Sequence, residues 1–255
     1  RGHWFWLPLL PLSHIAGVQV IARAHRTAQV LGLDAPALPD PLPDLRGHFD
    51  AAAFTELATA ALAQAEQAGL PAFTSLVPTQ LTRLVTGADA RARGLLKRFA
   101  AVLVGGAATS PDVLARARAR RIAVRTTYGS SETAGGCVYD RLPLPGVELG
   151  LEAPDAAGAG RLRIGSPTLA LGYLTADGGT DTTPFSDSPT GPPTNDPTGV
   201  SPRRFLTSDL AELGEGGELT VLGRADDVII TGGRKVLPQD VERAIDRSLM
   251  LRGMV

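Results

Sequence analysis

The most constraining feature of the sequence is a strand, helix and strand in close succession. The apolar run AVLV at residues 101–104 predicts a buried strand, residues 111–121 predict a helix, and IAVRTTYG at residues 122–129 predicts a second strand. Two strands joined through a helix pair in parallel, because a parallel pairing needs a crossover of this length. Ser110 is expected to cap the helix, and Pro111 suits its first turn. The pattern predicts an α/β fold with a largely parallel sheet, whose ligands gather at the carboxyl ends of the strands.

Two segments rich in glycine and hydroxyl groups lie at these predicted strand ends, VGGAATSP at residues 104–111 and TTYGSSETAGG at residues 126–136. Glycines let a backbone approach a ligand closely, hydroxyls and N–H groups hold phosphate oxygens, and a nearby carboxylate holds the accompanying metal. An ordinary turn from strand to loop uses the same residue types, so one segment alone favours neither interpretation. Because both segments open onto the same edge of one sheet, together they favour a nucleotide site.

The rest of the chain predicts helices at residues 15–27, 49–68 and 79–85, and then short strands with turn signals after about residue 140. We expect three parts. They are a three-layer α/β region over residues 1–148, a small β-rich subdomain over residues 149–225 with a mobile surface loop at 175–202, and a hinge with the start of a mobile C-terminal domain over residues 226–255.

Composition excludes several classes of function. With 44% hydrophobic and 20% charged residues in 255, the chain suits a folded soluble core. The net charge of -1 and the lack of a long basic block exclude an electrostatic footprint for nucleic acid or anionic membrane. The opening apolar stretch is interrupted by Pro8 and Pro11 and is too short to span a bilayer. We therefore expect no nucleic-acid partner and no integral membrane segment.

A single cysteine, Cys137, excludes an internal disulfide, and the four histidines show no zinc-binding spacing with it. A reducing, cytoplasmic location fits this usage, with Cys137 as a buried structural thiol. The chain opens without Met on what reads as a buried strand and turn. We expect it to be a fragment of a longer protein.

Six motifs, in their usual order, resemble those of the adenylate-forming acyl-CoA synthetases and adenylation domains. They are PLSHIAG at 11–17, VGGAATSP at 104–111, TTYGSSET at 126–133, TSDL at 207–210, GRADD at 223–227 and TGGRKVLPQDVE at 231–242. Within that superfamily the chain looks most similar to the o-succinylbenzoate–CoA ligases of menaquinone biosynthesis, in their actinobacterial form.

The resemblance implies an enzyme that uses ATP and Mg²⁺ to convert a small carboxylic acid into an acyl-adenylate, and then transfers the acyl group to coenzyme A. The implied acid is o-succinylbenzoate, and the implied assembly is a homodimer. Another acyl-CoA synthetase or an amino-acid adenylation domain is the neighbouring alternative. The sequence lacks the family's phosphate loop and its late lysine. A non-catalytic nucleotide-binding fragment is therefore a second alternative, and we expect weak nucleotide binding and impaired adenylation from this chain alone.

For the nucleotide, the resemblance implies a pocket built from the second and third motifs. Tyr128 would stack on adenine, and Glu132 would be the catalytic residue that holds Mg²⁺. Considered alone, these two favour a core aromatic and a solvated loop acid. The small residues that would line the adenine pocket or approach the phosphates are Gly105, Gly106, Ala107, Thr127, Gly129, Ser130 and Ser131.

Further roles follow from the later motifs. Asp209 would accept hydrogen bonds from both ribose hydroxyls, and Arg224 would add a cationic donor nearby. Asp226 would be the hinge of the C-terminal domain. The residues that would approach coenzyme A are Gly232, Gly233 and Lys235. Without the motifs, these positions are ordinary turn and surface residues.

The acid would be bound by residues of the predicted helix at 15–27 and of the segment before it. His14 resembles the family's gate between the acyl pocket and the nucleotide, although a lone histidine beside an apolar strand is more often a core residue. Arg23 shares a helical face with Ala16 and Gln19 and could bind the distal carboxylate of a dicarboxylic acid, because a guanidinium fork matches a carboxylate in two bonds. A surface arginine is the equal alternative.

Overall fold

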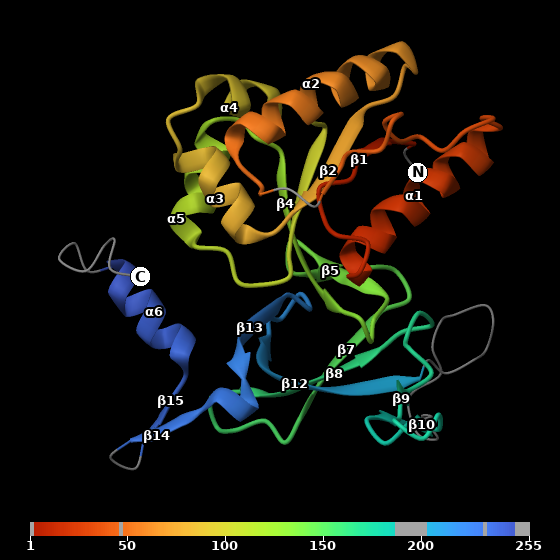
Figure 1. Cartoon of the computed structure of the whole chain (residues 1–255). Coiled ribbons are helices and arrows are strands. Elements are labelled where there is room, and N and C mark those ends of the chain that lie inside the picture. The colour runs from red at the N-terminus through yellow and green to blue at the C-terminus, as the bar shows by residue number, and fades with distance from the viewer. Residues whose placement is uncertain (1–2, 46–47, 187–202, 232–233, 248–255) are drawn as a thin grey trace. The chain divides into compact units, whose positions relative to one another are not determined.

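The chain forms two compact units, residues 1–140 and 141–255. Figure 1 shows the computed structural model, which describes residues 3–45, 48–186, 203–231 and 234–247. The expected three-part division stays a prediction.

The first unit is built on a mixed sheet with the strand order β1-β2-β3-β4-β5. The strands are β1 (Phe5–Leu7), β2 (Ala72–Leu76), β3 (Ala101–Val104), β4 (Val124–Ser130) and β5 (Gly135–Tyr139). The first three pairings are parallel, and only β5 runs antiparallel to its neighbour β4. The predicted α/β class with a largely parallel sheet is confirmed, and so is the parallel pairing of β3 and β4.

Helices cover both faces of this sheet (Figure 1). They are α1 (Ile15–Leu31), α2 (Ala51–Gln67), α3 (Pro78–Thr86), α4 (Ala90–Leu96) and α5 (Pro111–Ala119). On one face, Val20 and Ala24 of α1 pack with Trp6 of β1 and Leu103 of β3. On the other face, side chains of α2 to α5 form a larger core with alternating strand residues such as Val102 and Val104. The predicted three-layer arrangement is therefore confirmed.

The helix ends show where local sequence rules held and where they failed. Asp50 caps α2 by accepting a 2.8 Å hydrogen bond from Ala53 N–H. Helix α4 was not expected, yet Asp89 caps it in the same way through Ala92 N–H at 2.9 Å. The expected cap at Ser110 is wrong, because its side chain makes no capping hydrogen bond to α5. Pro111, whose fixed φ suits the first helical turn, starts that helix instead.

The second unit is largely antiparallel β-structure around β12. Its elements are β6 (Leu142–Pro143), β7 (Glu148–Glu152), β8 (Gly160–Gly165), β9 (Tyr173–Leu174), β10 (Thr180–Asp181), β11 (Phe185–Ser186), β12 (Arg204–Leu213), β13 (Leu219–Arg224), η1 (Ala225–Asp227), β14 (Ile229–Thr231), β15 (Arg234–Val236) and α6 (Pro238–Arg247). Strand β12 pairs antiparallel with β8, β11 and β13, and β8 also pairs with β7.

The range expected as a loop, residues 175–202, begins with two short strands. Phe185 of β11 is buried and stacks on Phe205 of β12, with ring centroids 4.9 Å apart. The burial of one aromatic side chain thus ties this polar segment to the sheet. Residues 187–202 lie outside the described residues.

Candidate functional site

The segment TYGSSET forms the end of β4 and the turn of a β-hairpin, whereas we expected a strand end that continues into a loop. Tyr128, Gly129 and Ser130 belong to β4 and pair with β5, with Gly129 opposite Gly136. A Cβ atom built on Gly129 would lie 2.1 Å from the carbonyl oxygen of Gly135. Glycine therefore lets the two strands approach this closely, and the chain continues as a strand where a bulkier residue would push it away.

The turn of this hairpin is held by the buried hydroxyl of Thr133. Its Oγ1 accepts a 2.9 Å hydrogen bond from Ser130 N–H and donates a 2.7 Å bond to the Gly135 carbonyl. Gln19 of α1 adds a hydrogen bond from Nε2 to the Ala134 carbonyl at 2.6 Å. The turn that carries the motif's hydroxyls and carboxylate is thus fixed from inside the hairpin and from α1.

The side chains expected to meet the nucleotide lie along this hairpin at different depths. Tyr128 and Glu132 are half-buried, whereas Ser131 is exposed. Among the described residues, no group of three or more His, Cys, Asp and Glu side chains could hold a metal by itself. Mg²⁺ usually binds through one or two carboxylates together with phosphate oxygens and waters, so a single carboxylate at Glu132 fits a phosphate-bound ion.

The first glycine motif lies against this hairpin strand. A Cβ atom on Gly105 would lie 2.2 Å from Thr127 Oγ1 and 2.8 Å from the Thr127 carbonyl oxygen. Thr127 Oγ1 also donates a 3.3 Å hydrogen bond to the carbonyl of Val104 at the end of β3. Beyond this contact, Gly106 with φ of 86° and Ala107 are exposed. The structure therefore brings the two predicted motifs together at the ends of adjacent parallel strands, and it leaves small residues open beside them.

Arg23 is not a free surface arginine. Its Nη2 donates a 2.8 Å hydrogen bond to the Tyr139 hydroxyl of β5, and its Cζ lies 5.3 Å from the centroid of the Trp6 ring. Cation–π contact and a phenol partner together fix the direction of the half-buried guanidinium. Since Gln19 contacts the same hairpin one helical turn earlier, α1 and the nucleotide motif are joined at two points.

His14 stands just before α1 as its N-cap residue and is exposed, so it is not a core histidine. Its Nδ1 lies 3.1 Å from the Ser13 hydroxyl oxygen. Nothing in its surroundings assigns it a proton-transfer role, and the gate function stays a prediction.

In the second unit, Asp209 lies on β12 directly opposite Arg224 of β13. Arg224 forms an exposed ion pair with Asp226 in η1, with Nη2 and Oδ2 3.6 Å apart. The structure thus brings together the predicted ribose-binding pair and the predicted hinge residue. Such an exposed pair contributes little to stability, which leaves Arg224 able to exchange partners.

Of the three residues expected near coenzyme A, the structure describes only Lys235. Gly232 and Gly233 lie outside the described residues. Lys235 lies on β15, where its backbone pairs with Ile230 of β14. Their contact with coenzyme A stays a prediction.

Cys137 is buried at the centre of β5, and this burial raises the pKa of its thiol. A thiol that keeps its proton is a poor nucleophile, as expected for a structural cysteine. Sequence reasoning missed Thr133 and Tyr139, because each acts on a partner that local pattern does not reveal. The spacing of Gln19 and Arg23 on one helical face was the one available signal.

Residues 50–174 match the family model described as AMP-binding enzyme. A Mycobacterium tuberculosis protein named "Probable 2-succinylbenzoate–CoA ligase" is 39% identical over 248 residues, which cover 96% of this chain and 54% of that protein. The unliganded o-succinylbenzoate coenzyme A synthetase of Bacillus subtilis superimposes with a TM-score of 0.66 at 20% identity, and the match covers 98% of this chain and 50% of that one. The complex of the same enzyme with ATP and magnesium ion gives 0.62 at 21% identity, over 95% and 46% of the two chains.

By sequence, residues 50–174 form part of an AMP-binding domain. The chain is a homologue of the 2-succinylbenzoate–CoA ligases, and it shares the fold of the solved synthetases. The chain spans about half the length of the curated relatives that it matches first. Among the described helices, none has the length and apolar character needed to cross a membrane.

Proposed function

We propose that the protein is an AMP-forming acid–CoA ligase that converts o-succinylbenzoate into its coenzyme A thioester through an acyl-adenylate. The observation that carries this proposal is the 39% identity, over nearly the whole chain, to a ligase named for that substrate. The geometry also supports the proposal, because the two glycine motifs lie in contact and the hairpin turn beside them is rich in hydroxyl groups.

The first unit supplies the groups that would hold the adenine and the phosphates. Gly106 and Ala107 would leave space and open backbone for the adenine edge, Gly105 would let the two strand ends lie close together beside it, and Tyr128 would offer a ring to stack on it. Thr127, Gly129, Ser130 and Ser131 would lie beside the phosphates, with the Ser130 and Ser131 hydroxyls as donors, because the Thr127 hydroxyl and the Ser130 N–H already donate to Val104 and Thr133. These donors are already held by the hairpin, so they need no reorganisation when charge develops on the phosphate. Removing one such donor typically lowers the rate by about a hundredfold or more.

Glu132 is the residue that would hold Mg²⁺ on the phosphates. Bound there, the ion would neutralise phosphate charge and make the departing phosphate groups better leaving groups. In the second unit, Asp209 would accept hydrogen bonds from the ribose hydroxyls, and Arg224 would add a positive charge beside it.

Arg23 would recognise the distal carboxylate of the acid. Because Tyr139 and Trp6 hold its guanidinium in place, little side-chain entropy would be lost when a carboxylate binds. A dicarboxylic acid is therefore favoured over a monocarboxylic acid of the same shape. His14 would stand between the acid and the nucleotide, and Asp226, Gly232, Gly233 and Lys235 would serve the domain movement and coenzyme A.

The test is an assay of pyrophosphate release by the product of the complete reading frame, with ATP, Mg²⁺ and a panel of acids. We expect the highest kcat/KM with o-succinylbenzoate, and formation of its coenzyme A thioester when coenzyme A is added. The Glu132→Gln variant should bind AMP normally but release pyrophosphate far more slowly. Activity with another acid or an amino acid, and none with o-succinylbenzoate, would contradict the substrate assignment. AMP binding without pyrophosphate release from any acid would instead favour a non-catalytic nucleotide-binding protein.

A homodimer and a cytoplasmic location are part of this proposal. The single buried cysteine supports a reducing compartment. Light scattering coupled to size-exclusion chromatography tests the dimer, and a mass equal to one chain would contradict it.

A further inference from the structure

The segment Thr207–Ser208–Asp209 forms a bulge in the central strand of the second unit. Strand β12 pairs with β8 at Leu206 opposite Arg163, and the pairing resumes only at Leu210 opposite Arg161. Three residues of β12 thus face a single residue of β8. A bulge of this kind leaves backbone groups without their ladder partners and turns side chains away from the regular pleat.

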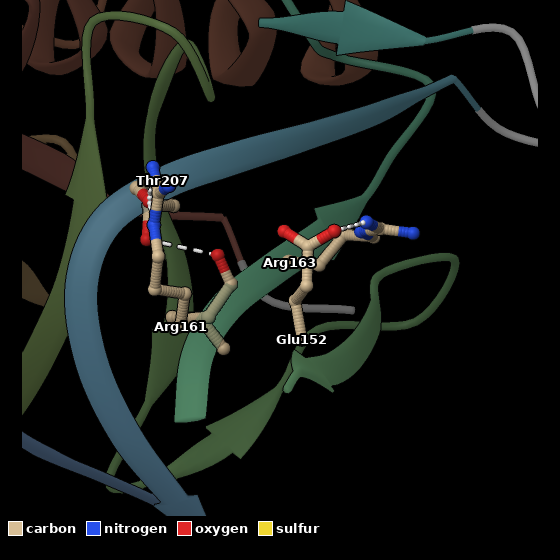
Figure 2. A network of polar contacts seen from close by, with 5 residues as sticks. Glu152, Arg161, Arg163 and Thr207 are labelled. Atoms are coloured by element: carbon tan, nitrogen blue, oxygen red, sulfur yellow. Dashed lines mark hydrogen bonds and ion pairs between the residues drawn. The ribbon is translucent and has the colours of Figure 1, made fainter. Parts of the chain in front are cut away.

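Two side chains supply the missing hydrogen bonds of the bulge. Thr207 Oγ1 donates a 2.9 Å bond to the Leu162 carbonyl and accepts a 3.0 Å bond from Asp209 N–H. The Thr207 carbonyl oxygen accepts two bonds from the guanidinium of Arg161, from Nε at 3.2 Å and from Nη2 at 3.0 Å. Figure 2 shows Arg161 reaching across from β8 to Thr207 on the neighbouring strand.

This contact fixes the backbone two residues before Asp209. A charged donor makes a stronger hydrogen bond to a carbonyl than a neutral donor does, and a planar guanidinium with two N–H groups on one oxygen also sets its direction. Thr207 is itself buried, whereas Arg161 is an exposed residue. The orientation of Asp209 therefore depends on Arg161, which acts through the Thr207 carbonyl.

We propose that Arg161 is a positioning residue for nucleotide recognition: it holds the bulge that presents the Asp209 carboxylate to the ribose hydroxyls. This inference rests on the proposed function, because it requires that Asp209 bind ribose. It adds a residue outside every motif that suggested the nucleotide site.

The same strand offers a matched control. Arg163 lies two residues further along β8, so its side chain leaves the same face of the sheet. Its Nη2 pairs with Glu152 Oε1 on β7 at 2.7 Å and not with the bulge (Figure 2). Both arginines are thus partly exposed strand residues with one neighbouring-strand partner, and only one of them contacts the bulge.

The experiment measures the dissociation constants of AMP and 2′-deoxy-AMP for the product of the complete reading frame and for its variants Arg161→Ala, Arg161→Lys, Arg163→Ala and Asp209→Ala. In the parent protein, the missing hydroxyl should weaken binding by about tenfold or more, as for a lost hydrogen bond to a charged group. The measured quantity is the ratio of the dissociation constant of 2′-deoxy-AMP to that of AMP. This ratio should fall toward one in Asp209→Ala and Arg161→Ala, take an intermediate value in Arg161→Lys, and stay at the parental value in Arg163→Ala. Thermal unfolding of each variant establishes that it is folded at the temperature of the titration.

The ratio distinguishes positioning from general stability, because a merely less stable protein loses affinity for both nucleotides equally. A parental ratio in Arg161→Ala, with the ratio lost in Asp209→Ala, would overturn the role of Arg161 and leave the proposed function intact. An equal loss of the ratio in Arg163→Ala would also overturn it. A parent protein that does not bind AMP, or that keeps its ratio in Asp209→Ala, would refute the ribose assignment itself and the inference with it.

Discussion

Arg23 of α1 and Tyr139 of β5 are joined by a 2.8 Å hydrogen bond between residues 116 positions apart in the sequence. The bond connects the helix that follows His14 with the hairpin that carries Tyr128 and Glu132. If Arg23 binds the acid, the acid site and the nucleotide site share this hydrogen bond. A substitution in one site should then also alter binding at the other.

Replacing Arg23 with Leu should raise the KM for o-succinylbenzoate by about tenfold to a hundredfold, because a charged hydrogen-bonded pair with the distal carboxylate is lost. Steady-state pyrophosphate release measures the effect. A monocarboxylic analogue that lacks the distal group is the matched control, and its KM should change little. An unchanged KM for o-succinylbenzoate would remove Arg23 from the site.

Gly105→Ala should destabilise the first unit by about 1–3 kcal/mol, because the new methyl group would overlap the Thr127 side chain and backbone. It should also weaken AMP binding, since the strand ends must separate to make room. Urea unfolding followed by circular dichroism gives the free energy of unfolding.

The control for this change is Gly94→Ala in α4, where an added Cβ meets nothing within 4 Å. There the substitution should stabilise by about 0.5–1 kcal/mol, because alanine restricts the unfolded chain and favours the helix. A destabilisation of the same size at both positions would mean that close packing at Gly105 is not the cause.

Local sequence patterns predicted the elements of the first unit well, because they reflect burial and backbone preference within one segment. The run AVLV formed β3, and Pro111 started α5 as expected. The patterns failed where a distant partner decides. The predicted strand ended at Gly129, yet the pairing of Ser130 with Gly135 turns the expected loop into a hairpin with β5.

The candidate site divides in the same way. Residues of the motifs, such as Gly105 and Thr127, were predicted and lie together. The supporting residues Thr133 and Tyr139 and the bulge at Asp209 were not predicted. A side-chain hydrogen bond within a turn, a bond from a helix to a strand and a shift in strand register leave no periodic signal in the sequence.

Thr133→Val should lower the free energy of unfolding by about 1–3 kcal/mol, because two backbone groups of the hairpin turn lose the buried hydroxyl that pairs with them. Nucleotide affinity should fall as well, since the turn carries Ser131 and Glu132. The same substitution at Thr59, an exposed residue of α2, should change stability little because valine and threonine have similar helix propensity. Equal effects at both positions would contradict a special role of the Thr133 hydroxyl.

Cys137 should make stability depend on alkaline pH. Burial raises the pKa of its thiol in the folded protein, an effect that a hydrogen bond with Thr133 partly opposes. The stabilisation of the folded protein by the buried, protonated thiol is therefore fully present below the pKa of an unfolded cysteine, about 8.5. This stabilisation is lost as the pH rises through the higher pKa of the folded state. Urea midpoints of the parent and of Cys137→Ala between pH 7 and pH 10 should converge as the pH rises. A constant difference over that range would refute the shift.

The pairing of the sheet strands also sets the order in which the chain can organise itself. Phe5 on β1 pairs with Ala72 on β2, so this contact must close a long loop, whereas Ser130 and Gly135 pair across a short turn. Hairpins form in about 1–10 μs, whereas parallel strands pair more slowly because distant segments of the chain must first meet. The hairpin with the nucleotide motif can therefore be an early folding unit, around which the slower sheet assembles.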